Sequence, residues 1–191
     1  MKDPIFYKIV RPIIKYLFLI VFRPKIIGRK NIKKNESIVL CGNHTNYLDC
    51  LLLISCTNRV IHFLAKDSLY KGIKKPIFKG MGIIPVNRSI KDKSVLKKAN
   101  SVLNNKGLVG VFPEGTINRT NDIIMPFKIG AVKMASDTNS LIIPFIITGK
   151  YKILHNNLKI EFLKGYKISN KEIEKENKIL MDKVKQKLEK R

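Results

Sequence analysis

Residues 38–49 read IVLCGNHTNYLD, an apolar run that continues into a polar loop carrying a histidine and a carboxylate. The run is rich in Val and Ile and is followed by Gly42, a pattern typical of a buried strand. Comparable runs recur at 60–64, 83–86, 108–112 and 141–147, and an alternating strand is predicted at 158–163. Helical patterns separate them at 50–55, 92–106 and 129–137. This alternation predicts a single α/β domain in which helices cover a mostly parallel central sheet.

Two helix boundaries carry local signals. The apolar residues of 92–106 share one face, and Gly107 follows where a helix C-terminus favours a left-handed residue. Ser169 and Glu172 match a capping box ahead of an apolar repeat of four residues. We therefore expect a core domain at 25–168 and a C-terminal amphipathic helix at 169–191.

The net charge of the chain indicates which classes of molecule it could bind. The chain has 191 residues, and Lys+Arg 38 against Asp+Glu 14 gives a net charge of +24. Such a field attracts nucleic acid, anionic lipid, phosphorylated small molecules or an acidic carrier protein, and it does not choose among them. Part of the excess also fits a general compositional bias on solvated surface, because no compact basic block stands out.

The first 24 residues form a distinct segment. Positions 5–22 are mostly apolar, but Lys8, Arg11 and Lys15 interrupt them, and the uninterrupted run 16–22 is too short to span a bilayer. A helix lying among lipid headgroups is predicted, with its lysines facing lipid phosphate. The residues expected to enter the apolar layer are Phe6, Ile13, Leu17 and Ile20. The alternative is an ordinary helix packed on the domain, with its charges in water.

The cysteines give a weaker indication of compartment. Cys41, Cys50 and Cys56 are odd in number and lack the C-x-x-C spacing of a zinc or redox site. We expect buried free thiols in a reducing compartment.

The polar loop after the first run carries the chemistry. A histidine beside a carboxylate deprotonates a hydroxyl near neutral pH, and no serine or cysteine nucleophile accompanies His44. His44 and Asp49 would lie about 140° apart on a regular helix, so they meet only if 44–49 is a loop or an irregular helix entrance. Such a loop would lie at the carboxyl end of a strand, where open α/β sheets bind ligands. The alternative is that Asp49 merely caps the helix that follows.

Two further strings end strands in the same way. Residues 112–116 read FPEGT, and the glycine allows close approach of a ligand and offers its N–H. Residues 82–88 read GIIPVNR, and Arg88 is suited to a bidentate contact with phosphate. Each string alone is equally consistent with a plain turn or a surface arginine.

Taken in order, these strings resemble the glycerolipid acyltransferase family. That family carries N-H-x-x-x-x-D, G-x-I-P-V-x-R, F-P-E-G-T with a following arginine, and an apolar strand with a proline. Here the arginine is Arg119, after an intervening Ile-Asn pair, and the proline is Pro144. The string FKIGA at 127–131 also matches the family's Lys-x-Gly-Ala element. The resemblance spans residues 26–150.

The resemblance implies transfer of a fatty acyl group from acyl-CoA or acyl carrier protein to a lysophospholipid hydroxyl. The default acceptor is 1-acyl-sn-glycerol 3-phosphate, which gives phosphatidic acid; glycerol 3-phosphate and other lysophospholipids stay open. His44 would be the general base and Asp49 would orient it. The acceptor-binding residues would be Arg88, Glu114, Gly115, Thr116, Arg119 and Lys128, with Glu114 holding a glycerol hydroxyl or a basic side chain.

The resemblance implies no metal and no cofactor beyond the acyl donor as co-substrate. The amphipathic N-terminal segment predicts a place at the cell membrane, peripheral or monotopic on the cytoplasmic side, with an anionic membrane surface as partner. The rivals are a basic nucleic-acid-binding protein and a non-enzymatic lipid-binding protein. Against the first, no basic-aromatic platform or helix-turn-helix signature is visible, so we expect no nucleic-acid partner.

Overall fold

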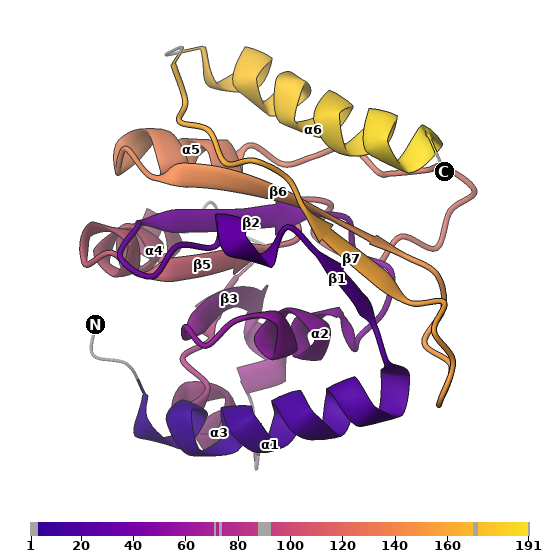
Figure 1. Cartoon of the computed structure of the whole chain (residues 1–191). Coiled ribbons are helices and arrows are strands. Elements are labelled where there is room, and N and C mark those ends of the chain that lie inside the picture. Colours follow the sequence, from indigo (N-terminus) through magenta and orange to yellow (C-terminus); the bar gives the residue numbers. More distant parts are fainter. Residues whose placement is uncertain (1–3, 71, 73, 88–92, 170–171, 191) are drawn as a thin grey trace.

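The computed structural model describes residues 4–70, 72, 74–87, 93–169 and 172–190. Its centre is a seven-stranded sheet in the order β1-β7-β6-β2-β5-β3-β4 (Figure 1). Within the described residues, neighbouring strands are parallel except for β6 and β7, which are antiparallel. The expectation of a single α/β domain with a mostly parallel sheet is confirmed.

The strands form at the predicted apolar runs. Their bounds are β2 Ile38–Gly42, β3 Ile61–Lys66, β4 Ile84–Val86, β5 Leu108–Val111, β6 Leu141–Thr148 and β7 Lys159–Phe162. The sequence did not predict β1, Lys25–Ile27, because three residues with a lysine at the start carry too little periodicity. This short strand pairs with β7 at one edge of the sheet.

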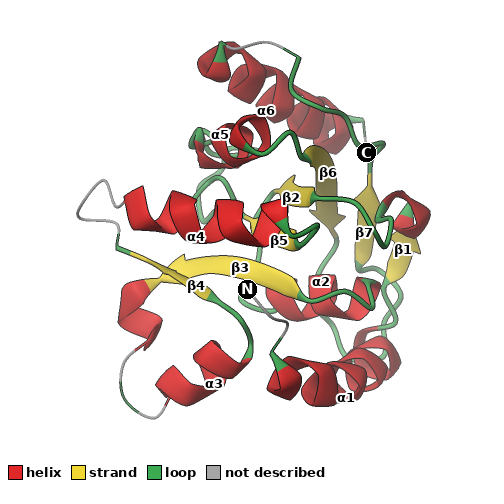
Figure 2. Cartoon of the chain, turned by 90° about the vertical axis from the view of Figure 1, so that its left-hand side faces the viewer, coloured by secondary structure: helices red, strands yellow, loops and turns green. Residues whose placement is uncertain are grey.

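Helices cover both faces of the sheet, so the molecule has three layers (Figure 2). On one face lie α1 Ile5–Phe22, α2 Asp49–Cys56 and α3 Lys74–Gly80. On the other lie α4 Lys93–Asn104, α5 Gly130–Asp137 and α6 Ile173–Glu189. An apolar core lies between the sheet and each layer of helices. The core on the α1–α3 side includes Leu52 and Phe145, and the core on the α4–α6 side includes Val102 and Leu180.

Two predicted helix ends differ from the structure. The left-handed residue after α4 is Lys106, with φ of 55°, and Gly107 follows it. Gly107 is required for a different reason, because a Cβ there would lie 2.5 Å from the carbonyl oxygen of Val102. The capping box at Ser169 does not form, since α6 begins at Ile173 and no side chain caps it.

Helix α1 has two apolar faces. Tyr7 and Phe18 are buried against the domain, with Ile14 and Phe22 packed beside them. The opposite face exposes a row of large apolar side chains, namely Ile5, Ile9, Ile13, Tyr16, Leu17 and Ile20. Part of the helix therefore packs as an ordinary core helix, while an apolar row stays uncovered. In the part of the chain that the structure describes, no helix has both the length and the apolar character to cross a bilayer.

Candidate active site at the carboxyl ends of β2 and β5

The loop after β2 is held rigidly to the sheet. Gly42 ends the strand where a Cβ would lie 2.1 Å from the carbonyl oxygen of Phe145, so only glycine fits. The side-chain amide of Asn43 then donates to the carbonyl of Ile147 at 2.9 Å and accepts from its N–H at 2.8 Å. These two bonds fix where the loop leaves the sheet, and hence where His44 begins.

His44 and Asp49 are in direct contact, as the family resemblance implied. Nδ1 of His44 lies 2.8 Å from Oδ2 of Asp49, and residues 43–48 form the required irregular entrance to α2. The same oxygen accepts the backbone N–H groups of Thr45 at 2.6 Å and Asn46 at 2.9 Å. Asp49 is fully buried and only accepts hydrogen bonds here, the role of an ionised carboxylate. This favours the tautomer with the proton on Nδ1, which leaves the Nε2 lone pair available.

The imidazole ring is held on its face as well. The Phe112 ring stacks on it with 4.0 Å between centroids and 18° between planes. The His44 side chain keeps 16% exposure, whereas Asp49 keeps none. The carboxylate is thus closed off from solvent, whereas part of the His44 side chain stays accessible.

Tyr151, from the β6–β7 connection, completes the surroundings of Asp49. Its hydroxyl donates to Oδ1 of Asp49. Burial, with the neighbouring Asp49 charge, raises the pKa of Tyr151 far above its ordinary value, so the hydroxyl stays a donor. No sequence pattern pointed to this residue, which lies 102 positions from its partner.

Glu114 ties two loops together. Oε1 accepts the backbone N–H of His44 at 2.8 Å, and Oε2 accepts that of Met125 at 2.9 Å. The side chain is 3% exposed, and burial raises its pKa against the opposing effect of these two bonds. The carboxylate thus joins the His44 loop to the loop at Met125, and its expected contact with a glycerol hydroxyl or a basic side chain stays a prediction.

An apolar cavity of about 680 Å³ opens beside His44. Its walls come from α1, α2, β3 and α3, with Phe6, Val10, Leu51, Phe63, Ile77 and Met81 among the lining side chains. Cys50 also lines it, but burial raises the pKa of that thiol to about 12, so it is protonated at neutral pH. The cavity has the size and apolar lining of a ligand site.

The other predicted site residues lie around this cavity in different ways. Gly115, Thr116 and Arg119 line it, and Arg119 donates to the hydroxyl of Tyr47 at 3.1 Å. Gly115 has φ of 77°, and its N–H donates to the carbonyl of Phe112. The expectation that this N–H would be free to bind a ligand is therefore wrong. Lys128 extends past Gly115, with Nζ 2.8 Å from where a Cβ would stand. Arg88 lies outside the described residues.

The titratable groups that the structure describes form no metal centre. Among the described residues, no three His, Cys, Asp or Glu side chains are grouped to hold a metal ion. Cys41, Cys50 and Cys56 are free thiols.

Comparison with known proteins agrees with the motifs. A family model described as Acyltransferase matches residues 23–148, which include the His44 loop, the Glu114 turn and β6. The 1-acyl-sn-glycerol-3-phosphate acyltransferase of Borreliella burgdorferi is 36% identical over 122 residues, which cover 62% of this chain and 48% of that protein. The enzyme of the same name from Bacillus subtilis is 26% identical over 145 residues, covering 75% of this chain and 71% of its own. The match thus spans about half the length of the first relative.

The fold comparison extends over nearly the whole chain. The 1-acyl-sn-glycerophosphate (LPA) acyltransferase PlsC from Thermotoga maritima superposes with a TM-score of 0.76 at 20% identity, covering 96% of this chain and 78% of the other. At that identity the likeness concerns the fold alone. Since the family model covers more than half of the residues, including both motif-bearing loops, the chain belongs to the acyltransferase family.

Proposed function

We propose that this protein transfers a fatty acyl group from a thioester donor to the free sn-2 hydroxyl of 1-acyl-sn-glycerol 3-phosphate, giving phosphatidic acid. One observation carries the proposal: His44, paired with a buried Asp49, stands at the wall of an apolar cavity of about 680 Å³. A base beside an apolar cavity suits a reaction between a hydroxyl and a lipid chain. Relatives named 1-acyl-sn-glycerol-3-phosphate acyltransferase support the choice of acceptor.

The reaction is a direct transfer. Nε2 of His44 accepts the proton of the acceptor hydroxyl as its oxygen attacks the thioester carbonyl. The carbon–sulfur bond breaks, and the leaving thiolate takes the proton back from the imidazolium. Asp49 holds the Nδ1 proton and stabilises the imidazolium in between. The high pKa of the Cys50 thiol argues against an acyl-enzyme on that side chain.

The surroundings suggest a division of binding roles. The apolar cavity would take a fatty acyl chain, and the exposed cations Arg119 and Lys128 beside the Gly115 turn would contact the acceptor phosphate. Thr116 at the cavity rim offers a hydroxyl. Arg88 stays a candidate phosphate contact from its sequence alone. The net charge of +24 suits an acidic carrier protein and the phosphates of coenzyme A equally well.

We also propose that the protein works at the cytoplasmic face of the cell membrane as a peripheral or monotopic enzyme. The apolar row on α1 supports this, because its six exposed large apolar side chains on one helix are costly in water. The same helix lines the cavity through Phe6, Val10 and Ile14. A lipid-derived chain would therefore travel a short way from the bilayer to the site.

The direct test is a panel of acceptors against both donors. Purified protein with phospholipid vesicles receives labelled acyl-CoA or acyl carrier protein, together with 1-acyl-glycerol 3-phosphate, glycerol 3-phosphate or lysophosphatidylcholine. Labelled phosphatidic acid as the main product supports the proposal, with either donor. Transfer to another acceptor in preference would replace the substrate and keep the reaction, whereas no acyl transfer under any combination would contradict the reaction itself.

A further inference from the structure

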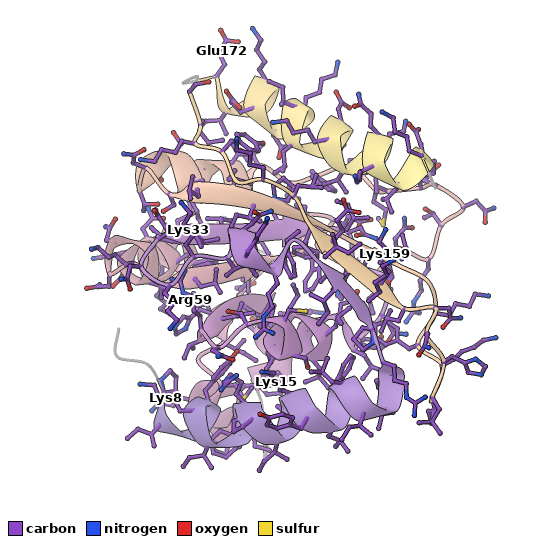
Figure 3. All side chains as sticks on the ribbon, in the orientation of Figure 1. Lys8, Lys15, Lys33, Arg59, Lys159 and Glu172 are labelled. Carbon is purple, nitrogen blue, oxygen red and sulfur yellow. The ribbon has the colours of Figure 1, made fainter. Side chains whose placement is uncertain are left out.

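Helix α6 buries a polar side chain against the loop 125–129, which leads into α5. Asn177, Leu180 and Val184 are three and four residues apart, so they lie on one face of α6. All three are buried, and Leu180 and Val184 belong to the apolar core on that side of the sheet. By contrast, the exposed side chain of Glu172, just before α6, turns away from the domain in Figure 3. Asn177 thus places an amide in a row of core residues, where an apolar side chain is usual.

The amide of Asn177 holds a backbone carbonyl of this loop. Its Nδ2 donates to the carbonyl oxygen of Phe127 at 2.7 Å, across 50 positions of sequence. Its Oδ1 is buried and has no hydrogen-bond partner among the residues that the structure describes. A buried acceptor without a partner lowers the stability of a fold, so packing alone would favour a leucine of similar size at this position. The contribution of the asparagine is therefore its bond to Phe127.

This bond fixes the orientation of one peptide unit. The carbonyl of Phe127 and the N–H of Lys128 belong to the same planar peptide. Asn177 holds the carbonyl, and the N–H donates to the carbonyl of Pro113 at 2.9 Å. Because the peptide is held through both of its polar groups, the direction in which the Lys128 side chain leaves the backbone is set.

The Lys128 side chain runs from this peptide to the wall of the acyl-transfer site. Its Nζ, Cε and Cδ lie 2.8, 3.0 and 3.4 Å from where a Cβ on Gly115 would stand. Gly115 lines the apolar cavity beside His44. A rotation of the peptide ahead of Lys128 would therefore move the ammonium group relative to the cavity.

We propose that Asn177 is a positioning residue for acceptor binding, because it fixes the peptide from which Lys128 reaches the acceptor phosphate. The inference rests on the proposed function, in which Lys128 contacts that phosphate. A charge-assisted hydrogen bond depends steeply on geometry, so a displaced ammonium binds the phosphate more weakly. Helix α6 lies beyond residues 23–148, which the family model matches, so acceptor binding would depend on a helix outside the matched region.

The first test compares two changes on the same face of α6. Asn177→Leu keeps the size of the side chain and removes the donor, whereas Val184→Ala leaves an apolar void. We expect Asn177→Leu to raise KM for 1-acyl-glycerol 3-phosphate about fivefold. Its kcat and its KM for the acyl donor should not change, since Glu114 still holds the loop at Met125.

Stability separates this role from a purely structural one. Leucine at 177 removes one unpartnered acceptor and leaves another at Phe127, so the free energy of unfolding should change little. Val184→Ala should lower the free energy of unfolding and keep the acceptor KM of the unaltered chain. An acceptor KM that rises equally in both variants, or in neither, overturns the inference.

The second test asks whether Asn177 acts through Lys128. Lys128→Gln removes the charge and should itself raise the acceptor KM. If Asn177 acts by positioning that charge, Asn177→Leu has no further effect in the Lys128→Gln protein. The same increase in acceptor KM with and without Lys128→Gln would mean that Asn177 acts elsewhere, and would overturn the inference.

A third measurement does not depend on acyl transfer. Hydrogen–deuterium exchange at residues 125–129 is followed by mass spectrometry, and we expect faster exchange in Asn177→Leu because the loop loses one of its anchors. Unchanged exchange and an unchanged acceptor KM, in a chain that transfers acyl groups, overturn the inference and leave the proposed function intact. Absence of transfer in the unaltered chain contradicts the proposed function, and with it the role of Asn177 in acceptor binding.

Discussion

Tyr151 donates a hydrogen bond to the buried carboxylate of Asp49, across 102 positions of sequence. The Tyr151 ring in turn meets Phe18 and Phe22 of α1 edge-on, with centroids 6.2 and 5.7 Å away. The helix with the exposed apolar row is therefore packed directly against the residue that holds Asp49. Because of these contacts, the geometry of the His44–Asp49 pair depends on the position of α1 against the domain.

Tyr151→Phe removes the hydroxyl and keeps the ring. Asp49 then loses one donor, and we expect kcat to fall about tenfold because the carboxylate holds the imidazole less firmly. KM should change little, since the ring lies behind the dyad and away from the substrate. The pH profile of kcat should shift, because the hydrogen-bonding of the dyad carboxylate changes. Steady-state kinetics over a pH series measures all three.

Tyr16→Phe on the exposed face of α1 is the matched control for this variant. It removes a hydroxyl from the same helix assembly without touching Asp49, and should retain full activity. A Tyr151→Phe enzyme with unchanged kcat and an unchanged pH profile would show that the bond to Asp49 has no role in positioning.

Glu114→Gln tests the carboxylate that joins two loops. An amide side chain accepts only through its single oxygen, so one of the backbone N–H groups of His44 and Met125 loses its acceptor. The expected loss is about 1–3 kcal/mol in the free energy of unfolding, with lower activity because the His44 loop shifts. Glu174→Gln at an exposed position of α6 should leave stability nearly unchanged. Denaturant melts of both variants that coincide with the unaltered chain would contradict this role.

The raised pKa of Glu114 also predicts a pH dependence. Because the folded-state pKa lies above the ordinary value of 4.5, the folded protein holds this proton more tightly than the unfolded chain does. The stability that this raised pKa contributes is fully present below pH 4.5 and is lost as the pH rises through the folded-state pKa of Glu114. The difference in unfolding free energy between the unaltered chain and Glu114→Gln should therefore decrease over that rise. A difference in unfolding free energy that increases with pH would contradict the raised pKa of Glu114.

The apolar row on α1 predicts vesicle binding. Deleting the helix would remove Tyr7 and Phe18 from the core, so point variants are the better probe. Ile9→Gln with Ile13→Gln and Leu17→Gln should release the protein from anionic vesicles and keep the fold, since all three are exposed. Ile129→Gln with Ile179→Gln, exposed at the start of α5 and on α6 across the sheet from α1, is the control. Equal sedimentation of the two sets would contradict membrane docking through α1.

The strands were predictable because buried parallel strands are continuous apolar runs, as at 108–112 and 141–147. The edge strand Lys25–Ile27 was not, since its three residues depend on pairing with β7 from the far end of the chain. The prediction that Gly107 would be the left-handed residue was wrong, because the sequence does not show the contact that requires a glycine there. A glycine after a helix signals a tight backbone, but the sequence does not tell a left-handed turn from a close approach to Val102.

The site, like the fold, contains features that the sequence predicted and features that it did not. The contact between His44 and Asp49 was predictable from the family resemblance, whereas the spacing of five required only that the backbone be irregular if the two side chains meet. Tyr151 was not, because no local pattern links it to a carboxylate in another loop. The motif containing Glu114 identified an important position, but a residue type alone does not reveal that both its oxygens serve backbone amides.

The most direct measurement compares His44→Ala with His155→Ala in transfer of labelled acyl groups to 1-acyl-glycerol 3-phosphate on vesicles. His155 is exposed in the β6–β7 connection, so its loss controls for removing an imidazole. If His44 is the base, its variant loses about 100-fold or more in kcat while the control retains full turnover. Equal turnover in the two variants would contradict the account.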